Sequence, residues 1–193
     1  MTCENLFVIY APNLGGNHLA NMLSLGKNYA ERFDPASYDQ KVSTAHFAYI
    51  SQIDLDGIRT NLDQLTTQSN VFCGHWMEYM LFKQSDLAEY FPNKKFFAIQ
   101  MPSEGTPGYD RLTRRDPSMN NAWLFNEVTL LYKVPNLATL CNETTSPWYY
   151  VWPDLLFDSD INKLFADLKQ QGFEIDVDLD LVQDLHTKWV NRL

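Results

Sequence analysis

The chain has 193 residues, of which 45% are apolar and 14% aromatic, and its net charge is −9. This composition is typical of a single globular domain over residues 1–193 and excludes a disordered chain. The acidic balance argues against non-specific binding to nucleic acid or to an anionic membrane surface. No signal-like N-terminus or long apolar run is present, and three widely spaced cysteines are typical of reduced thiols, so we expect a cytoplasmic protein with no membrane association.

Apolar runs and helical patterns alternate along the chain. In chain order they predict a strand at 5–11, helices at 17–33 and 53–65, a strand at 69–76, a helix at 77–91, a strand at 94–101, a helix at 122–140, a strand at 147–153, and helices at 159–171 and 178–192. No hairpin dipeptide separates the strands, so helical crossovers and parallel pairing follow. The predicted fold class is therefore α/β, a three-layer α/β/α sandwich around a short parallel sheet.

Three polar or glycine-containing segments follow predicted strands. They are PNLGGNH after the first strand, GHW at the end of the second, and MPSEGTPG after the third. Ligands of parallel α/β sheets bind at the carboxyl ends of the strands. The convergence of these segments on one edge predicts a binding site there.

The first of these segments, APNLGGNHLANML at 11–23, has two readings. Gly15 and Gly16 permit a close backbone approach, and a helix beginning near Asn17 would offer free N–H groups to an anion. The stretch contains no Lys, Arg, Ser or Thr and is not a Walker A loop. The alternative is a tight strand-to-helix turn with Asn17 as the helix cap.

The four histidines differ in their predicted positions. His75 ends the second strand, where an imidazole, which titrates near neutrality, can act as a general base. The alternative is a buried histidine bonded to a backbone carbonyl. His18, at the start of the first helix, could donate to a phosphate or simply lie on the surface. We expect structural roles for His46 and His186.

The loop from 102 to 117 combines hydroxyl and guanidinium side chains with proline and glycine. Ser103, Tyr109 and Arg111 are its candidate ligands for an anion, because guanidinium groups bind phosphate or sulfate through paired hydrogen bonds. An ordinary surface loop is the alternative. No metal site is predicted, since the cysteines and histidines lack ligand spacing on any one element.

Several segments, taken in order, resemble the P-loop sulfotransferase family, which transfers sulfuryl from 3′-phosphoadenylyl sulfate (PAPS) to a hydroxyl or an amine. PNLGGNHL matches the first loop of the family at Pro12 and Gly15, and VFCGHW places a histidine where the family has its catalytic base. FPNKKFFAIQMP, at 91–102, is similar to the segment that precedes the 3′-phosphate contacts, although Gln100 stands at the arginine position. YYVWPDLLFDSDINKLF is similar to a later family segment and its helix.

The resemblance implies a fold of the P-loop nucleoside triphosphate hydrolase type and a PAPS- or PAP-type nucleotide as cofactor. His75 would be the catalytic base, and the acceptor would be a hydroxyl of a small molecule or a glycan. The implied cofactor-binding residues are Asn13, Leu14, Gly15, Gly16, Asn17 and His18 in the first loop, with Ser103, Tyr109 and Arg111 replacing the 3′-phosphate contacts. In the first loop, Asn13, Gly16 and Asn17 stand where the family has charged or hydroxyl residues.

Two alternatives stay open. One is a non-catalytic protein of the same fold that binds a different anion. The other is a nucleotide-sugar transferase, because NLGGNHLANMLSLGKNYAERF is also similar to the start of some GDP-fucose-dependent fucosyltransferases.

Overall fold

The computed structural model describes residues 3–11, 14–29, 55–60, 62–106, 109 and 146–191. Within them one four-stranded sheet is formed, in the order β2-β1-β3-β4, and every strand pair is parallel. The strands are β1 (Asn5–Tyr10), β2 (Asn70–His75), β3 (Lys94–Ile99) and β4 (Trp148–Val151). The predicted α/β class and parallel sheet are confirmed.

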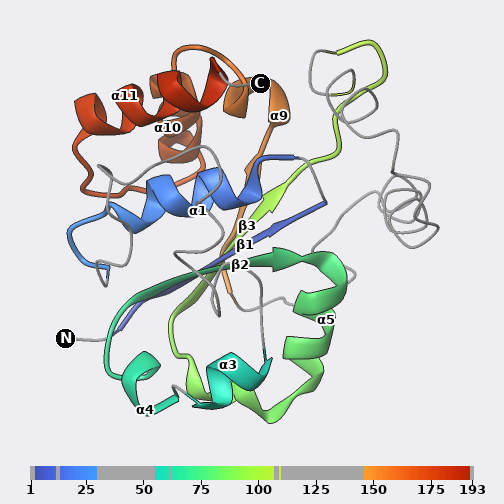
Figure 1. The fold of residues 1–193 in the computed structure, drawn as a ribbon, viewed down its shortest axis with the longest axis vertical. Helices are drawn as coiled ribbons and strands as arrows, with labels where there is room; N and C mark the ends of the chain where they lie inside the picture. The colour runs from blue at the N-terminus through green and yellow to red at the C-terminus, as the bar shows by residue number, and fades with distance from the viewer. Residues whose placement is uncertain are drawn as a thin grey trace.

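Helices flank the sheet on both sides (Figure 1). One side carries α1 (Gly16–Ser24), α10 (Asn162–Gln170) and α11 (Leu179–Val190). The other carries α3 (Leu55–Thr60), α4 (Leu62–Leu65) and α5 (Trp76–Gln84), with the 3-10 helix η2 (Asp86–Tyr90) following α5. A four-residue helix, α9 (Pro153–Leu156), follows β4.

The helix boundaries differ from those that the sequence pattern predicted. The helix expected over 17–33 ends at Ser24, and residues 30–33 lie outside the described residues. Gly26 packs so tightly that a Cβ there would be 2.8 Å from the Ile175 side chain. The helix expected over 77–91 is α5 followed by η2, with Ser85 capping η2 through a hydrogen bond from the Leu87 N–H. The helix expected over 122–140 lies outside the described residues.

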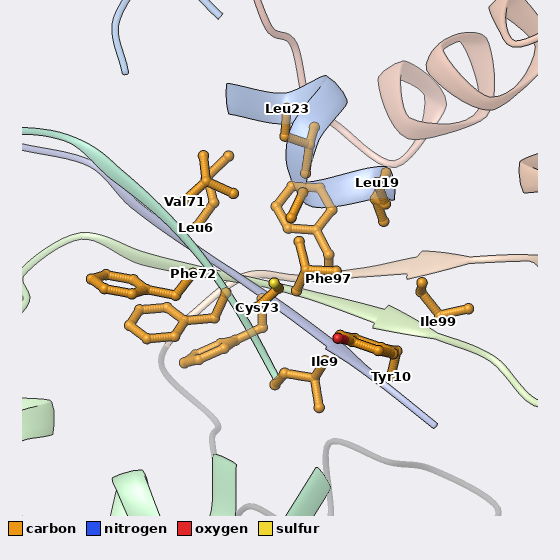
Figure 2. Close-up of a cluster of buried hydrophobic side chains, with 14 of the residues drawn as sticks. Leu6, Ile9, Tyr10, Leu19, Leu23, Val71, Phe72, Cys73, Phe97 and Ile99 are labelled. Atoms are coloured by element: carbon orange, nitrogen blue, oxygen red, sulfur yellow. The ribbon is translucent and has the colours of Figure 1, made fainter. Parts of the chain in front are cut away.

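The core has two layers because the strands are buried on both faces. Under the sheet, Phe7 contacts the rings of Phe72, Phe82, Phe91 and Phe96 at centroid distances of 4.9–6.4 Å. Above it, α1 and its neighbours cover the other face, where Leu19, Leu23, Val71 and Phe97 lie (Figure 2). All six residues of β1 are buried, which explains its uninterrupted apolar sequence.

A buried pair of asparagines joins the amino ends of β1 and β2. Asn5 and Asn70 are each 1% exposed and face each other in register. The Asn70 amide nitrogen lies 2.9 Å from Asn5 Oδ1, 2.7 Å from the Leu65 carbonyl and 2.8 Å from the Gln68 carbonyl. We call this pair the asparagine clamp, because it fixes the chain that enters β2 against β1.

The strand order positions the candidate site. The chain leaves β1 toward β2 on one side, and β3 then adds on the other side of β1. In open α/β sheets, the crevice at such a reversal, outside the carboxyl ends of the strands, is where ligands bind. The segments after β1 and β3 both lie at that edge. No helix in the described ranges is long and apolar enough to cross a membrane.

Candidate functional site

Tyr10 and His75 end neighbouring strands and share one face of the sheet. They are partners in the parallel register of β1 and β2, and their ring centroids are 5.0 Å apart at an angle of 76°. Tyr10 is 4% exposed, whereas His75 is partly exposed at the edge of the sheet. His75 therefore stands at the predicted position, and the ring of Tyr10 supports it from the side.

The Tyr10 hydroxyl connects this edge to the first turn of α1. It donates to Asn17 Oδ1 at 2.6 Å, and the Cys73 thiol approaches the same oxygen at 3.3 Å. Figure 2 shows the Tyr10 ring and the Cys73 sulfur within the same buried cluster. Two donors on the amide oxygen fix the orientation of the amide. The Asn17 nitrogen then remains a donor, and no acceptor for it is recorded in the described part of the chain.

The start of α1 also has unused backbone donors. The first i to i−4 bond of the helix runs from the Leu19 N–H to the Gly15 carbonyl at 3.0 Å. Within the described ranges, the N–H groups of Gly16 and Asn17 have no recorded acceptor, and the first turn contains no acidic residue. Such N–H groups and the positive end of the helix dipole favour an anion.

The two glycines of the turn have packing roles. Gly15 is the N-cap of α1 with a φ of 78°, and a Cβ there would lie 3.0 Å from Trp189 and 3.2 Å from Leu156. At Gly16 a Cβ would lie 2.0 Å from the Tyr10 ring. Gly16 thus allows the tyrosine ring, and not only a ligand, to approach the helix. The alternative in which Asn17 caps the helix is wrong, because Gly15 holds that position.

Leu14 and His18 face away from solvent. Leu14 is fully buried, and its N–H donates to the Ala11 carbonyl at 3.3 Å, which brings the chain back to the end of β1. His18 is 2% exposed, stacks on Trp189 with centroids 4.1 Å apart, and bonds to His186. The alternative in which His18 lies on the surface is wrong, and its binding of a cofactor stays a prediction.

The segment after β3 forms a separate hollow of about 540 Å³ lined by Met101, Pro102, Ser103, Glu104 and Tyr109. The structure thus brings together the predicted ligands Ser103 and Tyr109. Thr106 shapes the turn between them, because its hydroxyl donates a hydrogen bond to the Ser103 carbonyl and accepts one from the Tyr109 N–H. Asn13 and Arg111 lie outside the described residues.

Gln100, which stands at the family's arginine position, is bonded to the sheet. Its side-chain nitrogen lies 3.2 Å from the Ala98 carbonyl, and its N–H donates to the Val151 carbonyl at 2.9 Å. Lys83 lies in the last turn of α5, whereas it is the start of α5 that adjoins His75. Lys83 is therefore poorly placed to reach this edge.

Tyr10 and Cys73 were missed as parts of the site. Strand alternation was the available signal, because Tyr10 is the register partner of His75 and Cys73 lies two residues before it on the same face. No comparable sequence pattern indicates that Trp189 contacts Gly15, since the two residues lie near opposite ends of the chain.

Among the described residues, no three His, Cys, Asp or Glu side chains are grouped as metal ligands would be. Neither a protein-family model nor a curated protein sequence matches this chain.

Proposed function

We propose that the chain is a sulfotransferase-like transferase and that the edge formed by His75 and the start of α1 binds the phosphosulfate end of a PAPS-type nucleotide. One observation carries the proposal: the partly exposed imidazole of His75, at the end of β2, stands in register with the end of β1. The helix that follows β1 begins with unused N–H groups and the oriented amide of Asn17. The parallel sheet has helices on both sides, and this arrangement supports a three-layer fold of the P-loop type.

In this mechanism His75 removes the proton of an acceptor hydroxyl. The acceptor oxygen forms a bond to the sulfuryl sulfur while the bond from sulfur to the nucleotide phosphate oxygen breaks, and that oxygen leaves with the electron pair. The N–H groups of Gly16 and Asn17 and the Asn17 amide are donors of the kind that stabilises charge on the departing phosphate. Such chemistry also requires a cation, which Arg111 or Arg114 of the loop from 102 to 117 would supply.

A second candidate function has a specific observation in its favour. The space beside both glycines is filled by Tyr10, Trp189 and Leu156, and no lysine or arginine occurs in the first loop. These features favour a non-catalytic protein of the same fold that binds a smaller or less charged anion through backbone donors.

Ligand-induced stabilisation separates the two candidates. At about a hundred times its dissociation constant, 3′-phosphoadenosine 5′-phosphate (PAP) is expected to raise the free energy of unfolding by about 2.7 kcal/mol, which a melting scan detects. GDP at the same concentration is the control for a nucleotide-sugar enzyme. Stabilisation by GDP alone would favour the fucosyltransferase alternative. Cooperative melting with no response to either nucleotide would contradict both transferase proposals.

A further inference from the structure

Two buried histidines join the start of α1 to the C-terminal helix α11. His18 and His186 are 2% and 0% exposed, and His18 Nε2 lies 3.0 Å from His186 Nδ1. On its other side, His186 Nε2 lies 2.5 Å from the backbone carbonyl of Asp158. Neither histidine takes part in the proposed transfer chemistry.

The hydrogen-bond partners determine where the protons lie. A carbonyl oxygen only accepts, so His186 Nε2 carries a hydrogen. In the neutral ring Nδ1 is then an acceptor, and His18 Nε2 must donate to it. If both rings were protonated, two N–H groups would point at each other across 3.0 Å. The closed contact therefore holds at most one extra proton, and that proton would bring a buried charge.

The surroundings of the two histidines also disfavour the uptake of a single proton. Burial, followed by the charge on His186, holds the pKa of His18 well below its ordinary value of 6.5. Burial also lowers the pKa of His186, against the opposing effects of the Asp158 carbonyl and the Asp158 and Asp160 carboxylates. Lys163 already binds the Asp158 carboxylate at 2.8 Å. On α11, Asp184 and Lys188 pair with each other on the exposed side, and Asp180 is exposed in the first turn.

An aromatic stack depends on the same contact. Trp189, one turn beyond His186 on α11, stacks on His18 at 4.1 Å and on Phe157 at 5.3 Å. The Trp189 ring also covers Gly15, the N-cap of α1. Separation of the two histidines would therefore remove the packing that supports the turn before α1.

We infer that the His18–His186 contact is a proton-sensitive latch, which holds α11 against the start of α1 and opens in acid before the sheet unfolds. Once α11 is released, both imidazoles are free to take up protons, so protonation favours the open form. The latch does not rest on the role proposed for His75, and its test needs no nucleotide.

Hydrogen exchange of the native chain, corrected for the intrinsic effect of pH, tests the latch. In the open form, each of the two imidazoles takes up a proton near pH 6.5, whereas in the closed form neither does. The equilibrium constant for opening of α11 is therefore expected to rise about a hundredfold between about pH 7.5 and about pH 5.5. The β1 and β3 amides are expected to keep their protection over this range. Unchanged protection of α11, or equal loss of protection in α11 and the sheet, would overturn the inference.

Glutamine at both positions gives the matched variant, because its amide can donate to the same acceptors without titrating. In His18→Gln/His186→Gln, α11 protection is expected to become independent of pH, whereas His75→Gln retains the native response. If the double variant does not fold, His18→Gln alone is expected to reduce the change to about tenfold, one proton instead of two. A native response in the glutamine variants would also overturn the latch.

Discussion

His75→Ala is expected to lower the kcat of sulfuryl transfer by about 100- to 10,000-fold, the usual contribution of a positioned general base. The nucleotide-binding groups at the start of α1 are separate from the imidazole, so the dissociation constant of PAP is expected to change by less than about twofold. Steady-state kinetics with PAPS and a hydroxyl acceptor, together with a binding titration of PAP, measure the two quantities independently.

The control for His75→Ala is Lys27→Gln, beyond the carboxyl end of α1, where the lysine forms an exposed ion pair with Asp176 at 2.8 Å. This variant is expected to retain native kcat and native PAP binding, since exposed ion pairs contribute little. Undiminished turnover in His75→Ala would show that another group removes the proton. If PAP affinity and turnover instead fell by the same factor, His75 would belong to the binding residues.

Asn70→Asp is expected to lower the free energy of unfolding by about 4 kcal/mol at neutral pH. The Asn70 nitrogen faces three oxygens at 2.7–2.9 Å, and a carboxylate has no hydrogen to donate to any of them. The carbonyls of Leu65 and Gln68 would lose their donor beside a buried charge. Denaturant unfolding measures the loss, which is a large part of a typical stability of about 5–15 kcal/mol.

The loss in Asn70→Asp also depends on pH with a definite sign. The introduced carboxyl faces oxygens, so its protonated form, which has one donor, is favoured in the folded state. Its deficit relative to the native chain therefore increases as pH rises and shrinks in acid.

Asn5→Asp is the matched control for the asparagine clamp. Its carboxylate would still accept from Asn70 and would lose only the donation to the Pro92 carbonyl, now 2.8 Å from the Asn5 nitrogen. We expect roughly half the loss of Asn70→Asp, about 2 kcal/mol. A loss below about 1 kcal/mol in Asn70→Asp would mean that the clamp does not fix β2 against β1.

The strands and the fold class were predictable because they depend on local patterns. β1 is an uninterrupted apolar run, as expected for a strand covered on both faces, and the other three strands fall within the predicted ranges. The helix ends were less predictable, since α1 ends two residues before Gly26, which packs against Ile175 from a distant segment. α9 has only four residues after Trp152, too few to show a helical period.

The candidate site was predictable where it follows a strand and hidden where it depends on contacts across the chain. His75 and Asn17 stand at the carboxyl edge, as the order of strands and glycines indicates. The partner of His18 could not be read from one sequence, because His186 lies on the C-terminal helix and no spacing rule links the two. The same holds for Trp189, which packs on Gly15.

Calorimetric titration of PAP into the native chain and into Asn17→Asp tests the proposed site most directly. The introduced carboxylate can still accept from Tyr10 and Cys73, so the fold and its melting temperature are expected to be kept. It removes the amide donors and adds a negative charge beside the bound phosphate, so PAP affinity is expected to fall at least about tenfold, or about 1.4 kcal/mol. Equal PAP affinity in the native chain and the variant, or no binding by the native chain, would contradict a nucleotide site at the start of α1.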